Sequence, residues 1–104
     1  MEQLIIDTLA SARKHFTAFG LDAGQVDALL EAGARDLRKE LLQLKELVAV
    51  VPPDGERVAH SLHALKGLVM NMGNKDAGRV FAVLEETFRA SGEISGVRAL
   101  LGNG

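Results

Sequence analysis

The chain has 104 residues, enough for one domain with a single core, and 47% of them are hydrophobic, which excludes a chain disordered by composition. The net charge of −2 and the lack of a basic run exclude general electrostatic binding to nucleic acid or to an anionic membrane surface. Without cysteine there is no disulfide, thiolate nucleophile or cysteine-based zinc site, and no apolar run approaches the ~20 residues that span a bilayer. The start "MEQLIIDTLA" lacks the basic region of a signal peptide, so we expect a cytoplasmic protein.

Apolar residues recur at helical spacing, whereas alternation at period two is nowhere sustained. The first predicted helix covers residues 2–18, and the segment "FGLDAG" ends it. Asp22 is then the expected N-cap of a long second helix over about residues 23–50, with Gln25 as its capping-box partner. The apolar stripe of this second helix comprises Val26, Leu30, Leu37, Leu41, Leu44 and Val48.

The segment "VVPPDG" ends the second helix, since two prolines cannot continue it, and Asp54 is the expected N-cap of a third helix over about residues 55–72. Gly73 fits the position after a helix end, and Asn74 fits the N-cap of a fourth helix over about residues 75–90. The residues of the fourth helix expected to face inward are Ala77, Val80, Phe81, Leu84 and Phe88.

Short connections between amphipathic helices favour antiparallel neighbours. The sequence therefore predicts an all-α fold, an up-down antiparallel four-helix bundle with an extra N-terminal helix and a short C-terminal helical turn at "VRALL". We expect a single domain over residues 1–104, with the bundle core at about 20–92 and a frayed "GNG" at the end.

His63 occupies the solvent side of the third predicted helix. A helix advances about 100° per residue, which places the apolar residues of this helix roughly opposite His63. The same geometry places Lys66 and Gly67 within about 60° of His63. This face also carries Glu56, Ala59, His60, Lys66, Gly67 and Met70, and Asn71 lies at its edge.

Gly67 is unusual because a glycine in a helix interior costs about 1 kcal/mol relative to alanine. Since it points away from the expected core, we interpret it as clearance that lets a partner approach the imidazole of His63. A neutral imidazole can act as a nucleophile and form a covalent intermediate. A phosphoryl group on His63 would place negative charge near Lys66, which can stabilise it.

The segment "HALKG", followed by "LVM" and "NMG", resembles the histidine-containing phosphotransfer (HPt) family, whose pattern is His-x-Leu-Lys-Gly and then Asn-Leu-Gly. Leu84 and Glu85 stand where the family often has Leu-Glu on the next helix. The resemblance covers about residues 20–90 and is specific only over 63–73.

The resemblance implies a phosphorelay protein of a two-component system. In that role His63 accepts a phosphoryl group from an aspartyl phosphate on a response-regulator receiver domain and returns it to another receiver. Lys66 stabilises the phosphate charge and Gly67 provides clearance. It further implies a hybrid sensor kinase as partner, Mg²⁺ on the receiver, no cofactor of its own and no autonomous kinase activity. We expect a monomer rather than a dimer.

The chain departs from the family at His60, Leu68 and Met70, where small or polar residues are commoner, and its first helix is longer. Met70 either belongs to a docking surface or is partly exposed without a role. The residues expected to contact a partner are Ala59, His60, Met70 and Asn71.

Two other functions stay open from the sequence. One is a helical-bundle docking module that binds receivers without being phosphorylated. The other is a metal-binding bundle that uses Glu56, His60 and His63, although Lys66 would repel a cation. We expect a free-standing protein rather than part of a sensor kinase, because the kinase phosphoacceptor segment and Gly-rich nucleotide-binding boxes are absent from the sequence.

Overall fold

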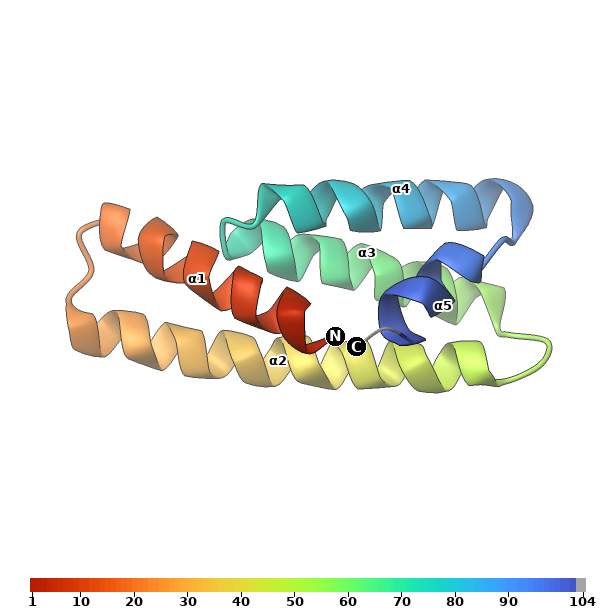
Figure 1. Cartoon of the computed structure of the whole chain (residues 1–104), viewed down its shortest axis with the longest axis horizontal. Helices are drawn as coiled ribbons and strands as arrows, with labels where there is room; N and C mark the ends of the chain where they lie inside the picture. Colours follow the sequence, from red (N-terminus) through yellow and green to blue (C-terminus); the bar gives the residue numbers. More distant parts are fainter. Residues whose placement is uncertain (103–104) are drawn as a thin grey trace.

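The computed structural model describes residues 1–102, which form five helices and no strand. In chain order they are α1 (Glu2–Ala18), α2 (Ala23–Ala49), α3 (Gly55–Asn71), α4 (Lys75–Ser91) and α5 (Ser95–Gly102). Figure 1 shows that α2 runs the length of the molecule, with α1 against its first half, α3 and α5 beside its second half, and α4 packed on α3. The predicted all-α bundle with an extra N-terminal helix is confirmed, and the C-terminal turn is a helix of 8 residues. Residues 103–104, which belong to the predicted domain and to the "GNG" expected to fray, lie outside the described residues.

The predicted helix ends are confirmed by their capping bonds. The Asp22 carboxylate accepts a bond from the Gln25 backbone N–H at 2.8 Å, and the Gln25 side chain accepts one from the Asp22 N–H at 3.0 Å. Asp54 accepts a bond from the backbone of the third residue of α3 at 3.3 Å. Gly73, with φ +78°, takes the left-handed conformation that favours glycine and turns the chain from α3 into α4.

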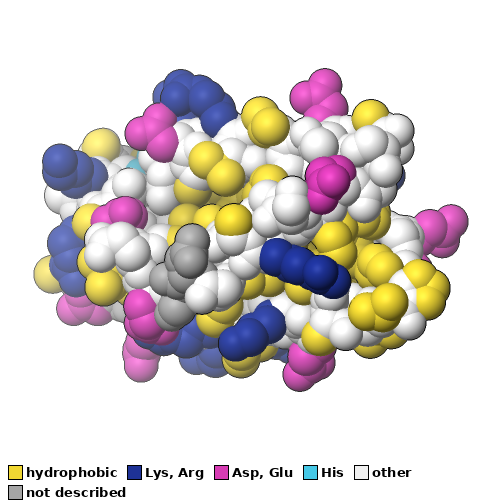
Figure 2. Space-filling view, turned by 45° about the vertical axis from the view of Figure 1, so that its right-hand side comes forward, with side chains coloured by type: hydrophobic (Ala, Val, Ile, Leu, Met, Phe, Trp, Pro, Cys, Tyr) yellow, Lys and Arg dark blue, Asp and Glu magenta, His cyan; other side chains and the backbone are white. Residues whose placement is uncertain are grey.

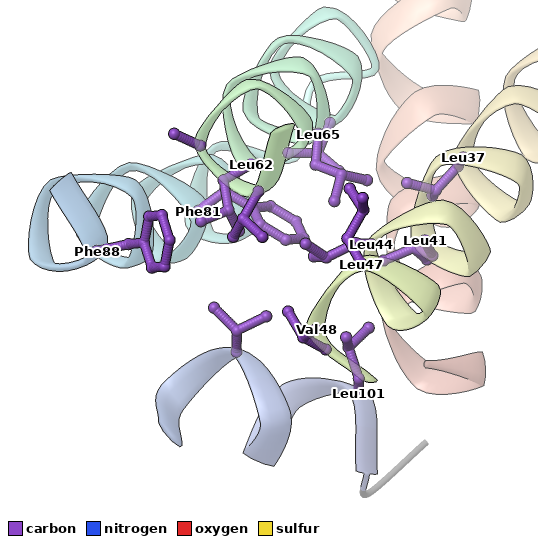
Figure 3. Close-up of a cluster of buried hydrophobic side chains, with 14 of the residues drawn as sticks. Leu37, Leu41, Leu44, Leu47, Val48, Leu62, Leu65, Phe81, Phe88 and Leu101 are labelled. Atoms are coloured by element: carbon purple, nitrogen blue, oxygen red, sulfur yellow. The ribbon is translucent and has the colours of Figure 1, made fainter. Parts of the chain in front are cut away.

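The main core lies where α2, α3 and α4 meet (Figure 3). The members labelled in Figure 3 are Leu37, Leu41, Leu44, Leu47, Val48, Leu62, Leu65, Phe81, Phe88 and Leu101. The core also takes in Ile5 from α1 and Val97 from α5. The first helix thus packs into the bundle through its apolar side.

Val80 was predicted to face inward, and this prediction is wrong because its side chain is 47% exposed. Phe81, the next residue, is 1% exposed and fills the core instead. A helix turns about 100° per residue, so a helix that buries Phe81, Ala77 and Phe88 carries Val80 to its outer side.

The surface mixes charges of both signs with hydrophobic side chains. On the face in Figure 2, Lys and Arg side chains are interspersed with Asp and Glu side chains, and hydrophobic side chains are exposed among them. That face therefore offers no field of a single sign to a charged partner.

Asn74 links α1 and α4 through one buried side-chain amide. Its side-chain oxygen accepts a bond from the Ala77 backbone N–H at 3.1 Å and caps α4, while its amide nitrogen donates to the Thr8 hydroxyl of α1 at 2.8 Å. Asn74 is 8% exposed and Thr8 is fully buried. The turn between α3 and α4 is thereby attached to α1.

We expect Asn74→Ala to lower the free energy of unfolding by about 2–3 kcal/mol, because it removes an N-cap and leaves the buried Thr8 hydroxyl unpaired. The measurement is urea unfolding followed by circular dichroism. Asn71→Ala, at an exposed position three residues earlier, is the matched control and should change stability by no more than about 0.5 kcal/mol. Equal effects of the two substitutions would contradict the assigned role of Asn74.

Candidate functional site

His63 lies on the outer face of α3, and its side chain is 61% exposed. Its neighbours along the helix, Leu62 and Leu65, are fully buried on the opposite side. The rigid helix therefore presents the imidazole to solvent, as the helical spacing predicted.

A carboxylate from α4 reaches His63. Glu85 Oε1 lies 3.2 Å from His63 Nδ1 and 3.7 Å from Lys66 Nζ. Glu85 Oε2 accepts a hydrogen bond from Arg89 Nε at 2.9 Å. The Glu85 side chain is only 12% exposed. It lies between α3 and α4 and contacts the imidazole of His63 and the basic groups of Lys66 and Arg89. We call His63, Lys66, Glu85 and Arg89 the histidine cluster.

Glu85 is ionised at neutral pH. Burial of its carboxyl works against ionisation, but hydrogen bonds from Arg89 and His63 and the charge of Lys66 outweigh it, so the pKa of Glu85 lies below its usual value of 4.5. An ionised carboxylate can only accept hydrogen bonds, so Nδ1 of His63 must carry the proton that joins them. When the ring is neutral, this leaves the lone pair on Nε2, the nitrogen that can act as a nucleophile.

The stability that this site contributes to the fold depends on pH through the carboxyl of Glu85. Because the pKa of Glu85 is lowered in the folded chain, the folded carboxyl binds fewer protons than the unfolded one. Its contribution to stability is therefore present above the usual pKa of 4.5 and is lost as the pH falls through the lowered value.

We expect Glu85→Gln to lower the free energy of unfolding by about 1 kcal/mol near neutral pH, and the difference from wild type to disappear in acid. The measurement is urea unfolding of both proteins at a series of pH values. Glu86→Gln, which removes a charge from the exposed neighbouring residue, is the control. A difference that persists unchanged at low pH would contradict the ionic role of Glu85.

Gly67 has open space beside it. A β-carbon added there would meet no atom within 4 Å, so packing within the chain does not require glycine. Beside Gly67 an open depression runs between α2 and α3, with Lys39 and Gln43 on one wall and Asn71 on the other. This agrees with the interpretation that the missing side chain leaves room for something outside the chain.

The four residues expected to contact a partner differ in their surroundings. His60, Met70 and Asn71 are exposed, and Met70 lies across Gly78 of α4, where an added β-carbon would collide with its sulfur. Ala59, in contrast, is 3% exposed and belongs to the main core, because α4 packs over this side of α3. Its side chain therefore has almost no surface to offer a partner.

Glu56, His60 and His63, the residues of the metal-binding alternative, do not form a common site. His60 lines a depression on the α2 side with Glu56 and Gln43, whereas His63 is directed to Glu85 on the α4 side. Among residues 1–102, no three His, Cys, Asp or Glu side chains come together in a way that could hold a metal ion. The structure therefore gives the metal-binding reading no support.

Sequence reasoning missed two members of the histidine cluster. Glu85 was noted only as part of the Leu84–Glu85 resemblance, and Arg89 was not singled out. The available signal was a Glu and an Arg four residues apart on one predicted helix, a spacing that favours an ion pair. That spacing does not reveal that the pair faces His63.

No family model, curated protein or solved structure gives a significant match to this chain. Within residues 1–102, none of the helices combines the length and the apolar character that crossing a bilayer requires. The case for a function therefore depends on the geometry of the histidine cluster and on the sequence motif around it.

Proposed function

We propose that the chain is a histidine phosphotransfer protein of a two-component phosphorelay. His63 accepts a phosphoryl group from the aspartyl phosphate of a receiver domain and passes it to another receiver. The observation that carries the proposal is the exposed imidazole of His63, held through Nδ1 by an ionised Glu85 so that Nε2 is the free nitrogen. Lys66 and the gap at Gly67 flank it on the same helix.

The reaction needs few groups from this chain. The Nε2 lone pair attacks phosphorus, an N–P bond forms, and the P–O bond to the aspartyl carboxyl breaks as that carboxylate leaves with the bonding electrons. The ring keeps its Nδ1 proton and becomes cationic, and the facing Glu85 carboxylate stabilises this charge. Lys66 compensates the negative charge of the phosphoryl oxygens. In the return step a receiver aspartate attacks phosphorus and the neutral imidazole is released.

The partners follow from the same chemistry. The receiver domain supplies the aspartyl phosphate and the Mg²⁺ ion, and a hybrid sensor kinase supplies the phosphoryl group at the head of the relay. The chain itself needs no cofactor for this role and acts as a carrier without kinase activity of its own, in the cytoplasm where receivers act.

The test is transfer from receiver domains of the source organism, each loaded with a radioactive phosphoryl group in the presence of Mg²⁺. We expect at least one receiver to label the full chain, with a label that is lost in acid and stable in base, as a phosphoramidate bond requires. Peptide fragmentation should locate the label on His63. A label on any other residue contradicts the proposal, and tight receiver binding without any label would support the docking-module alternative instead.

A further inference from the structure

The two oxygens of the Glu85 carboxylate have different partners. Oε1 faces His63 Nδ1 at 3.2 Å and Lys66 Nζ at 3.7 Å, both on α3. Oε2 accepts its bond from Arg89 Nε at 2.9 Å, one turn further along α4. Arg89 therefore holds the side of Glu85 that points away from the imidazole.

A glutamate side chain has three rotatable bonds, and fixing all of them costs conformational entropy. A contact from one side would leave the Glu85 carboxylate free to rotate about its last bond and to exchange its two oxygens. The hydrogen bond from Arg89 to Oε2 acts together with the contacts of Oε1, so the carboxylate is restrained at both oxygens and Oε1 is held toward His63.

We propose that Arg89 is a positioning residue, which holds Glu85 so that Oε1 keeps the proton of His63 on Nδ1 and leaves Nε2 free for the phosphoryl group. This inference rests on the proposed function for its consequence, the rate of phosphotransfer. Its direct effect, the site of the proton on His63, concerns the isolated chain and needs no partner.

A simpler role for Arg89 is support of α4, because a Glu and an Arg four residues apart on one helix stabilise that helix slightly. Such a role would leave the proton distribution on His63 unchanged. Arg79 offers a matched control, since it lies on the same helix and pairs with Asp76 at 2.7 Å, three residues away and outside the histidine cluster.

The experiment compares the full-length wild type with Arg89→Gln, Arg89→Lys and Arg79→Gln. Nitrogen NMR of the His63 ring, at a pH at which it is neutral, reports the ratio of the Nδ1–H to the Nε2–H form. In Arg89→Gln we expect this ratio to fall by about threefold or more, and phosphotransfer to slow with it, as for residues that act in one hydrogen-bond network. Arg89→Lys should partly restore the proton ratio and the transfer rate, and Arg79→Gln should match the wild type in both.

A double-mutant cycle shows whether Arg89 acts through Glu85. In a Glu85→Gln background, Arg89→Gln should change neither the proton ratio nor the transfer rate any further. An unchanged proton ratio in Arg89→Gln, an equal effect of Arg79→Gln, or a full effect of Arg89→Gln in the Glu85→Gln background would each overturn the inference. A shifted ratio in a chain that accepts no phosphoryl group from any receiver would contradict the proposed function and leave the positioning by Arg89 standing.

Discussion

His63→Gln is expected to abolish phosphorylation by receiver domains while leaving the fold intact. Glutamine has no imidazole nitrogen to form the N–P bond, so the loss should be complete rather than partial. The side chain is 61% exposed and lies outside the core, so the free energy of unfolding should change by no more than about 1 kcal/mol, the value of a surface ion pair. The measurements are transfer of radioactive phosphate from a loaded receiver and urea unfolding.

His60→Gln is the matched control for this substitution. His60 is exposed on the same helix, three residues before His63, but it is directed toward α2 and lies outside the histidine cluster. Because the His60→Gln protein keeps His63, it should still be labelled on His63, and any fall in its labelling rate measures the partner contact expected of His60. Labelling that survives in His63→Gln, or that disappears in His60→Gln alone, would contradict the assignment of His63.

Gly67→Ala is expected to change stability and activity in opposite directions. The added methyl group enters open space and improves the helix, so the free energy of unfolding should rise by about 0.5–1 kcal/mol. In the proposed function a receiver approaches His63 past Gly67, so the same methyl group should obstruct it, and a displacement of the reacting groups by about 1 Å slows a reaction by about 100-fold. A series of Ala, Leu and Gln at this position should slow transfer progressively while the chain stays folded.

Gly24→Ala is the control, because Gly24 is an exposed glycine in α2, remote from His63. It should leave the transfer rate unchanged. A Gly67→Ala protein that is more stable and transfers at the wild-type rate would show that the gap at Gly67 has no part in partner approach. A Gly67→Ala protein that is less stable would contradict the open space beside it.

Local sequence was sufficient to predict the helices and their ends. Asp22, Asp54 and Asn74 cap helices because their side chains accept bonds from backbone N–H groups only three residues away, a distance that the chain itself fixes. The exposure of His63 was predictable for a similar reason, since the helical repeat relates it directly to the buried Leu62 and Leu65.

The helical repeat predicted burial less well at positions where a neighbouring helix determines which side chains are buried. Ala59 shares the face of His63 on a helical wheel, yet α4 buries it. Val80 was placed with the core residues of α4, yet it faces solvent, because Phe81 takes the inward position. In both cases the wheel gives a direction within one helix but carries no information on where the neighbouring helix lies.

The same distinction separates the two halves of the candidate site. The sequence by itself determined an exposed His63 with Lys66 and Gly67 one turn away, because all three belong to one helix with a regular repeat. Only the tertiary structure decided that Glu85 and Arg89 join them, because the packing of α4 on α3 brings together side chains more than twenty positions apart in the chain. Which ring nitrogen of His63 faces Glu85, and which one stays free, is therefore set by a contact between helices, which no local pattern in the sequence specifies.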